Sequence, residues 1–209
     1  MRRVWLTISL LALLLSAGCS MQTGEETSPQ AVQNVIILSN RDYFPEVHQL
    51  FQEAEKSIKV MMYSASHYTE KPEFAGDIEH VPGTHWSNTN VLLDDLVAAK
   101  RRGVEVLIIL DDSSWNRSNA EKNKKFGQLL ADGGVTVYMD DPEVSTHTKL
   151  ILVDDDLTVV GSTNWSYYAL DKNNETSVFI ESSEINQSYQ AFFSQVLTDC
   201  TPLSIPGQP

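Results

Sequence analysis

Two side chains that can bind or react with phosphate, His147 and Lys149, lie two residues apart in the stretch STHTKLILVDDDLTVVGSTNWS, residues 145–166. Side chains two apart on a strand face the same way, so His147 and Lys149 should project together from the start of an apolar strand. A hairpin would then return the chain to Ser162 and Asn164 beside them. One imidazole, one ammonium, one hydroxyl and one amide suit a tetrahedral phosphate, because Lys149 neutralises charge, the hydroxyl and amide donate to phosphate oxygens, and His147 attacks or transfers a proton.

The spacing of these residues resembles the signature of the phospholipase D superfamily. That signature reads His-x-Lys, four residues, Asp, six residues, Gly-Ser-x-Asn. Its fixed positions are all present: His147, Lys149, Asp154, Gly161, Ser162 and Asn164. The order of apolar strands ahead of the motif, with VMMYSAS and AAKRRGVEVLIILDD, extends the resemblance over about residues 35–197.

The resemblance implies a role for each matched position. His147 would be the nucleophile or the acid, and Lys149 and Asn164 would bind phosphate. Glu175 stands where the family keeps an acidic residue that orients the histidine, although a solvated turn is the alternative for that residue.

Two further positions would support the site rather than react. Asp154 would stabilise the hairpin, or serve only its turn, since Asp155 and Asp156 follow it. Gly161 would support the return strand.

The family's reaction needs two such motifs, and this chain has one copy. One histidine attacks phosphorus to give a phosphohistidine, while the other protonates the leaving alcohol and then activates water. The second histidine must therefore come from a second chain, which implies a two-fold symmetric homodimer with a single site on its axis. The reaction requires no metal and no cofactor, and the histidines at 67, 80 and 85 fit no recognisable ligand spacing.

Alternating apolar runs and helical patterns predict the elements that must position these residues. We expect strands over 35–38, 58–63, 104–110, 135–139, 148–153, 157–160 and 176–180, and helices over 43–56, 89–102, 120–131 and 185–197. Such alternation predicts an α/β fold with a mixed, largely parallel central sheet flanked by helices on both faces. The domain would span 34–200, with a tail at 201–209. Residues 67–87 have no clear period and would be a lid or a disordered insertion.

The N-terminus reads as a targeting segment. Residues 1–18 combine a short basic start with an apolar run too short to span a bilayer. The small residues before Cys19 resemble a bacterial lipobox, so Cys19 would carry lipid and 19–33 would be a flexible tether; plain cleavage and a retained anchor are the alternatives. This predicts a secreted lipoprotein held at a membrane on the extracytoplasmic side. Cys200 would then be the one cysteine besides Cys19, with no intrachain disulfide expected.

The acidic charge leaves the substrate open. With 15 Lys and Arg against 28 Asp and Glu, the formal net charge is −13, which argues against non-specific nucleic-acid binding. Small size and a single motif favour a nuclease, whereas the acidic surface and tether favour a phospholipase. We therefore expect a phosphodiesterase acting on phospholipid or nucleic acid. The rival hypothesis is a catalytically silent phosphate- or nucleic-acid-binding lipoprotein of the same fold.

Overall fold

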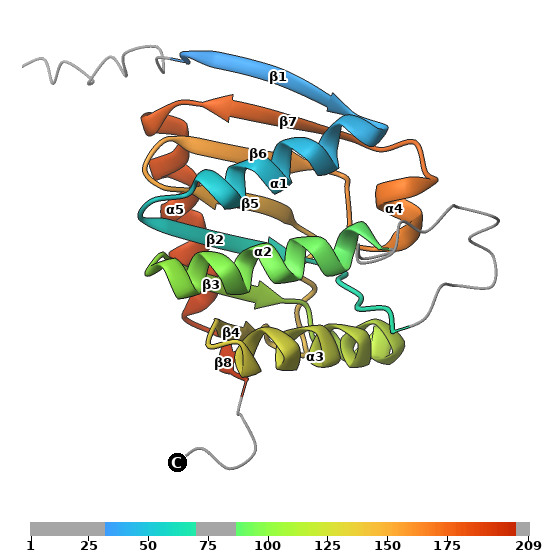
Figure 1. Cartoon of the computed structure of the whole chain (residues 1–209). Helices are drawn as coiled ribbons and strands as arrows, with labels where there is room; N and C mark the ends of the chain where they lie inside the picture. Colours follow the sequence, from blue (N-terminus) through green and yellow to red (C-terminus); the bar gives the residue numbers. More distant parts are fainter. Residues whose placement is uncertain (1–31, 70–86, 204–209) are drawn as a thin grey trace, which may run out of the picture.

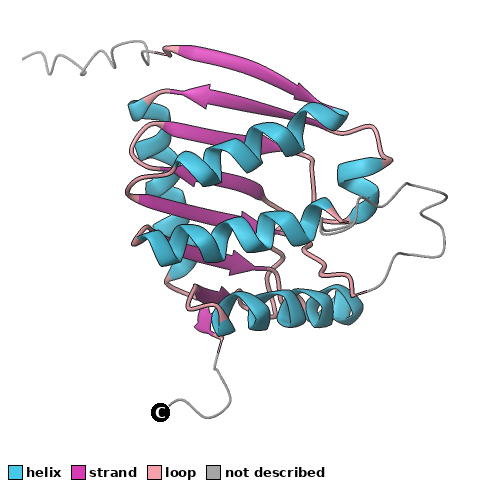
Figure 2. Ribbon diagram, viewed as in Figure 1, coloured by secondary structure: helices cyan, strands magenta, loops and turns pink. Residues whose placement is uncertain are grey.

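The computed structural model describes residues 32–69 and 87–203. The predicted signal peptide 1–18, Cys19, most of the tether 19–33 and most of the 67–87 segment lie outside the described residues. One eight-stranded sheet runs through the domain, and helices cover both of its faces (Figures 1 and 2). No helix within 32–69 or 87–203 has the length and apolar character needed to cross a membrane.

The elements follow the predicted order closely. The strands are β1 (Asn34–Ser39), β2 (Ser57–Met62), β3 (Glu105–Leu110), β4 (Thr136–Met139), β5 (Lys149–Val153), β6 (Leu157–Gly161), β7 (Thr176–Glu181) and β8 (Thr201–Pro202). The helices are α1 (Tyr43–Glu53), α2 (Asn88–Arg102), α3 (Arg117–Asp132), α4 (Tyr167–Asp171) and α5 (Ser183–Leu197), with short 3-10 turns at Asn40–Asp42 and Ser114–Asn116.

The strand directions correct the expectation of a largely parallel sheet. The order is β1-β7-β6-β5-β2-β3-β4-β8, in which only β2–β3 and β3–β4 are parallel and the other neighbours are antiparallel. Helices α2 and α3 provide the two crossovers that parallel neighbours need. A three-residue turn joins β5 to β6, and such short connections force antiparallel pairing.

The sheet separates two apolar layers. Helices α1, α2 and α3 lie on one face, in front of the sheet in Figure 1, and α5 covers the other. The larger core includes Phe51, Phe126 and Trp165, and a smaller one places Phe193 of α5 against Met61 and Leu150. Alternation along β5 explains the division, because Ile151 and Val153 belong to the larger core while Leu150 and Leu152 belong to the smaller.

Two short elements were not predicted. Helix α4 lies between β6 and β7, where Ser166 caps it by accepting a hydrogen bond from the Ala169 N–H. Thr201 and Pro202, assigned from sequence to the tail, pair with Met139 and Tyr138 of β4 as the edge strand β8. The predicted tail therefore begins inside the sheet, because the short strand satisfies backbone groups of β4 that a tail would leave unpaired.

Candidate active site

The predicted site residues converge at one edge of the sheet. The carboxyl ends of β2, β3 and β4, the start of β5 and the connection from β6 to β7 meet there. An open hollow of about 630 Å³ occupies this edge. Its lining residues are His147, Lys149, Val160, Gly161, Ser162, Asn164, Glu175, Thr176, Ser177 and Val178. Six of these ten were predicted from the sequence, and folding brings all six together.

Lys149 is a buried cation at the first position of β5, with 6% of its surface exposed. Its Nζ donates to the His147 carbonyl at 2.8 Å and lies 3.3 Å from both ring nitrogens of His147. Burial lowers the pKa of Lys149, and the charges of Glu175 and Asp111 oppose that shift. Among the described carboxylates none lies within ion-pair distance of Nζ. The positive charge of Lys149 is therefore free to neutralise a phosphate.

His147 is exposed, and the two residues before it, Ser145 and Thr146, are held by two buried carboxylates that were not predicted from the sequence. Asp111 accepts from the Thr146 N–H at 3.0 Å and from Ser145 Oγ at 3.2 Å. Asp140 accepts from the Thr146 hydroxyl. Each carboxylate directly follows a buried strand, β3 or β4, and that position was the available sequence signal. Because both are almost fully buried, a shift of the segment that presents His147 would remove hydrogen bonds from two buried carboxylates, which is costly.

Glu175 lines the hollow, and its carboxylate contacts Ser162 and Asn173, whereas the predicted partner was the His147 ring. Its carboxylate accepts from Ser162 Oγ at 2.5 Å and from Asn173 Nδ2 at 2.9 Å. Its backbone is fixed by Asn40, which accepts from the Glu175 N–H and donates its own N–H to the Glu175 carbonyl, each at 2.9 Å. Asn40 has a φ of 55°, a left-handed conformation that asparagine tolerates. The pairing of Glu175 with the His147 ring stays a prediction.

The return strand has two features that suit a binding pocket. Gly161 lies so close to β7 that an added Cβ would sit 2.2 Å from Ser177 Oγ and 2.4 Å from Ser177 Cα, so glycine is required where β6 meets β7. Asn164 Oδ1 is buried and has no hydrogen-bond partner among the described residues. A buried acceptor without a donor is costly, so the site leaves a hydrogen bond for a ligand or a second chain to supply.

Asp154 lies at the far end of the hairpin, away from the hollow. Its carboxylate accepts from the backbone N–H groups of Glu55, Lys56 and Ser57, at 3.2, 2.8 and 2.9 Å. Its φ of 51° is the left-handed turn conformation that aspartate tolerates better than most residues. These contacts tie the hairpin to the start of β2.

Replacing Asp154 by alanine should therefore lower the free energy of unfolding by about 2 kcal/mol, since charge-assisted hydrogen bonds to three N–H groups are lost. The neighbouring Asp155 provides the control, because it pairs with Lys56 while 71% of its side chain is exposed. Alanine there should change stability by less than about 1 kcal/mol. Urea denaturation followed by circular dichroism measures both; equal effects would show that Asp154 serves only the turn.

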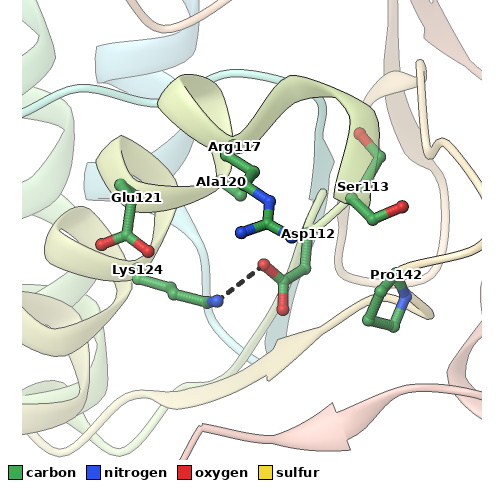
Figure 3. Close-up of a pocket in the computed structure, with 8 residues that line it drawn as sticks. Asp112, Ser113, Arg117, Ala120, Glu121, Lys124 and Pro142 are labelled. Atoms are coloured by element: carbon green, nitrogen blue, oxygen red, sulfur yellow. Dashed lines mark ion pairs between the residues drawn. The ribbon is translucent and has the colours of Figure 1, made fainter.

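A second hollow, of about 210 Å³, lies between α3 and the segment after β3. Arg117 and Lys124 extend from α3 toward Asp112, and Lys124 Nζ pairs with its carboxylate at 2.9 Å (Figure 3). Glu121 also lines this hollow, so its charges balance. Its described lining contains none of the predicted site residues and no imidazole or thiol.

The remaining sequence candidates that the structure describes do not form a site. Within 32–69 and 87–203, no three His, Cys, Asp or Glu side chains are grouped to hold a metal ion; His80 and His85 lie outside these ranges. Cys200 is a free, half-buried thiol. Burial raises its pKa to about 12, so it is protonated at neutral pH and is a poor nucleophile.

Comparison with known proteins shows which family and which relatives this chain is similar to. Residues 47–197 match the domain family described as "Cardiolipin synthase, PLD-like domain". The chain is 34% identical over 103 residues to a phospholipase D of Rickettsia typhi. That match covers 48% of this chain and 47% of the Rickettsia protein. The chain is 29% identical over 107 residues to the mitochondrial cardiolipin hydrolase of Xenopus laevis, covering 51% and 49%. The match spans about half the length of these relatives.

Solved structures show the same fold. The phospholipase D family member Nuc from Salmonella typhimurium is similar with a TM-score of 0.64, at 22% identity, over 81% of this chain and 97% of that chain. NucT from Helicobacter pylori is similar with a TM-score of 0.60, at 17% identity, over 81% and 98%. At these identities the likeness establishes the arrangement of strands and helices.

Proposed function

This chain belongs to the phospholipase D superfamily, as a member with one motif per chain, and on that premise we propose that it is a metal-independent phosphodiesterase acting through a phosphohistidine. The observation that carries the proposal is the convergence of His147, Lys149, Ser162 and Asn164 on one hollow at the sheet edge. An exposed imidazole beside an unneutralised ammonium is a nucleophile next to a phosphate-binding charge.

Each side chain has a part in the proposed reaction. A ring nitrogen of His147 attacks phosphorus, and the bond from phosphorus to the leaving alcohol oxygen breaks. Lys149 and Asn164 bind the phosphate oxygens through these steps, with Ser162 as a further donor. A second histidine gives its proton to the leaving alcohol and then takes one from water, which attacks phosphorus and breaks the phosphorus–nitrogen bond. This division needs one neutral and one charged imidazole.

We propose that the second histidine is His147 of another copy of this chain, in a homodimer with one site on the two-fold axis. Among the described residues one histidine lines the hollow, and the buried Asn164 Oδ1 has no donor within that part of the chain. Both features suit a site that a second copy completes.

An uncharged apolar surface beside the hollow suits that contact. We call it the α5-side surface. It is formed by side chains that the strand register or the α5 pocket places on that face: Val35, Ile37, Val160, Val178, Ile180 and Phe192. Ile37 is 68% exposed and Phe192 41% exposed. Val160 and Val178 also line the hollow, so the surface continues into the site.

The charges favour a protein partner for this surface over an anionic membrane. Strands β1, β6 and β7 and helix α5 contain no lysine or arginine, and their only acids are Glu181 and Glu184. Membrane-surface elements normally carry basic residues, whereas the centre of a protein interface is depleted of charge. An apolar surface can also meet its own copy across a two-fold axis.

The substrate is a phosphodiester of phospholipid or nucleic acid. We propose that lipidation at Cys19 holds the enzyme at a membrane on the extracytoplasmic side, which would place it near phospholipid.

The test is an assay of the mature protein in chelator, without divalent metal, on plasmid DNA, RNA and phospholipid vesicles, with a His147→Ala preparation as the blank. We expect hydrolysis above the blank on one of these substrates, and the substrate cleaved identifies the class. Equal rates in both preparations on all three would contradict the enzyme and leave the silent phosphate- or nucleic-acid-binding lipoprotein. Binding of DNA or phosphate without turnover would support that alternative.

A further inference from the structure

Tyr63 contacts both reactive side chains of the site. It is the first residue after β2, and its ring centroid lies 4.4 Å from that of His147 with the planes 55° apart. The ammonium of Lys149 lies over the same ring, 4.8 Å from its centroid. One aromatic ring therefore forms a wall behind both the imidazole and the cation.

Polar side chains of α3 and the preceding turn fix the position of Tyr63. Asn116 Nδ2 donates to the Tyr63 hydroxyl at 2.9 Å. Asn119 and Asn123 donate to the Tyr63 carbonyl at 2.7 and 2.8 Å. The Tyr63 N–H donates to the carbonyl of Thr148, between the two reactive residues, at 3.0 Å. Burying an asparagine side chain costs free energy unless its amide is hydrogen-bonded. Here the amides of Asn119 and Asn123 make that hydrogen bond to Tyr63.

The ring face of Tyr63 stabilises the buried ammonium of Lys149 without neutralising it. Burial disfavours the charged form of the ammonium, and no described carboxylate pairs with it. A carboxylate partner would stabilise the cation but would also cancel its charge and compete with phosphate. The negative face of an aromatic ring stabilises a cation without adding a net charge.

We propose that Tyr63 is a positioning residue of this site, whose ring face keeps Lys149 charged and fixes the plane of the His147 ring. The inference rests on the proposed phosphodiesterase function, because it assigns Lys149 the task of binding phosphate. Tyr63 acts through Lys149 and His147 and takes no part in bond making.

The expected pH dependence follows from the groups that face Lys149. These are His147, Glu175, Asp111 and the Tyr63 ring. Burial already lowers the Lys149 pKa, and Glu175 and Asp111 raise it. Loss of the ring face removes a stabilising contact from the charged form, so the pKa falls further. Phosphate binding needs the protonated ammonium, so activity on the basic limb is then lost at lower pH.

The experiment compares Tyr63→Phe, Tyr63→Leu and a series of phenylalanines with one to three ring fluorines incorporated at position 63. Fluorination weakens the negative face while nearly keeping the ring's size. Tyr138→Leu is the matched control, because Tyr138 is a half-buried tyrosine of β4 that packs against the smaller core. Two quantities are measured: the pH profile of kcat/KM, and the titration of Lys149 by NMR of the ¹³Cε signal in the free protein.

We expect Tyr63→Leu to lower kcat/KM roughly three- to thirtyfold, the range of a partly desolvated cation–π contact, and to move both the basic limb and the Lys149 titration to lower pH. Tyr63→Phe should leave the basic limb and the Lys149 titration unchanged. Each further ring fluorine should move both to a lower pH than the one before. Tyr138→Leu should move neither. If Tyr63→Leu does not fold, the fluorinated series alone decides.

A Lys149 titration that is the same across the fluorinated series would overturn the inference. That outcome leaves the proposed function intact if hydrolysis still depends on His147. Conversely, a protein without His147-dependent hydrolysis loses the proposed function, while the NMR titration still tests the ring contact. The two failures are therefore distinguishable.

Discussion

His147→Ala is expected to lower turnover on the cleaved substrate by about 10⁴-fold or more. The estimate combines loss of a nucleophile with loss of a general acid, each of which is typically worth several orders of magnitude. In a homodimer one substitution removes both groups, because each copy supplies one histidine. Binding of phosphate should be weakened far less, since Lys149, Ser162 and Asn164 remain in the hollow. Single-turnover kinetics and phosphate inhibition measure the two effects separately.

The matched control is His48→Ala. His48 is a half-buried histidine between α1 and α2, where Nδ1 lies 2.6 Å from Asp95 Oδ2. Its loss should affect stability and leave turnover within about twofold, since it is remote from the hollow. A direct check is labelling with phosphate-labelled substrate followed by quenching in alkaline detergent, which should trap a base-stable, acid-labile phosphohistidine in the wild type and none in His147→Ala. Residual turnover of His147→Ala above about a tenth of the wild-type rate would rule out His147 as the nucleophile.

Mixing wild-type and His147→Ala chains should inhibit the wild type. If a dimer has one site that needs both histidines, only wild-type pairs are active. After subunit exchange at equal concentrations, the activity per wild-type chain should fall to about half, and at roughly ninefold excess of variant to about a tenth, from random pairing in a two-fold dimer. Unchanged activity per wild-type chain would show that each chain works alone.

The interface has its own test. Ile37→Glu with Phe192→Glu places two charges on the α5-side surface, and burying unpaired charge in an interface is strongly unfavourable. We expect a folded monomer in sedimentation velocity and loss of at least about 100-fold in activity. Ile36→Glu is the matched control, because Ile36 is also exposed on β1 but its register partner Phe179 places it on the opposite face. A dimer that survives the double substitution would place the contact elsewhere.

The sequence alone identified the motif and all the α-helices and strands except the short helix α4 and the short strand β8. Burial on the two faces of β5 follows the alternation read from its residues, and the side chains of His147 and Lys149 lie together because a strand repeats every two residues. The absence of a second motif was equally visible, and it led to the homodimer that the experiments above test. Each of these properties depends on residues close together in the chain.

Contacts between distant residues were decided only by the tertiary structure. Strand periodicity is the same in parallel and antiparallel sheets. The sequence pattern therefore could not show that β7 is antiparallel to both of its neighbours, β1 and β6. Nothing near His147 in the chain indicates Asp111 or Asp140, which accept hydrogen bonds from the preceding Thr146 because β3 and β4 end at the same sheet edge. Tyr63 is 84 residues before His147, and β2 brings it there by pairing with β5. The sequence therefore determined which side chains can react with phosphate, whereas their charge state, orientation and support depend on long-range packing that no local pattern encodes.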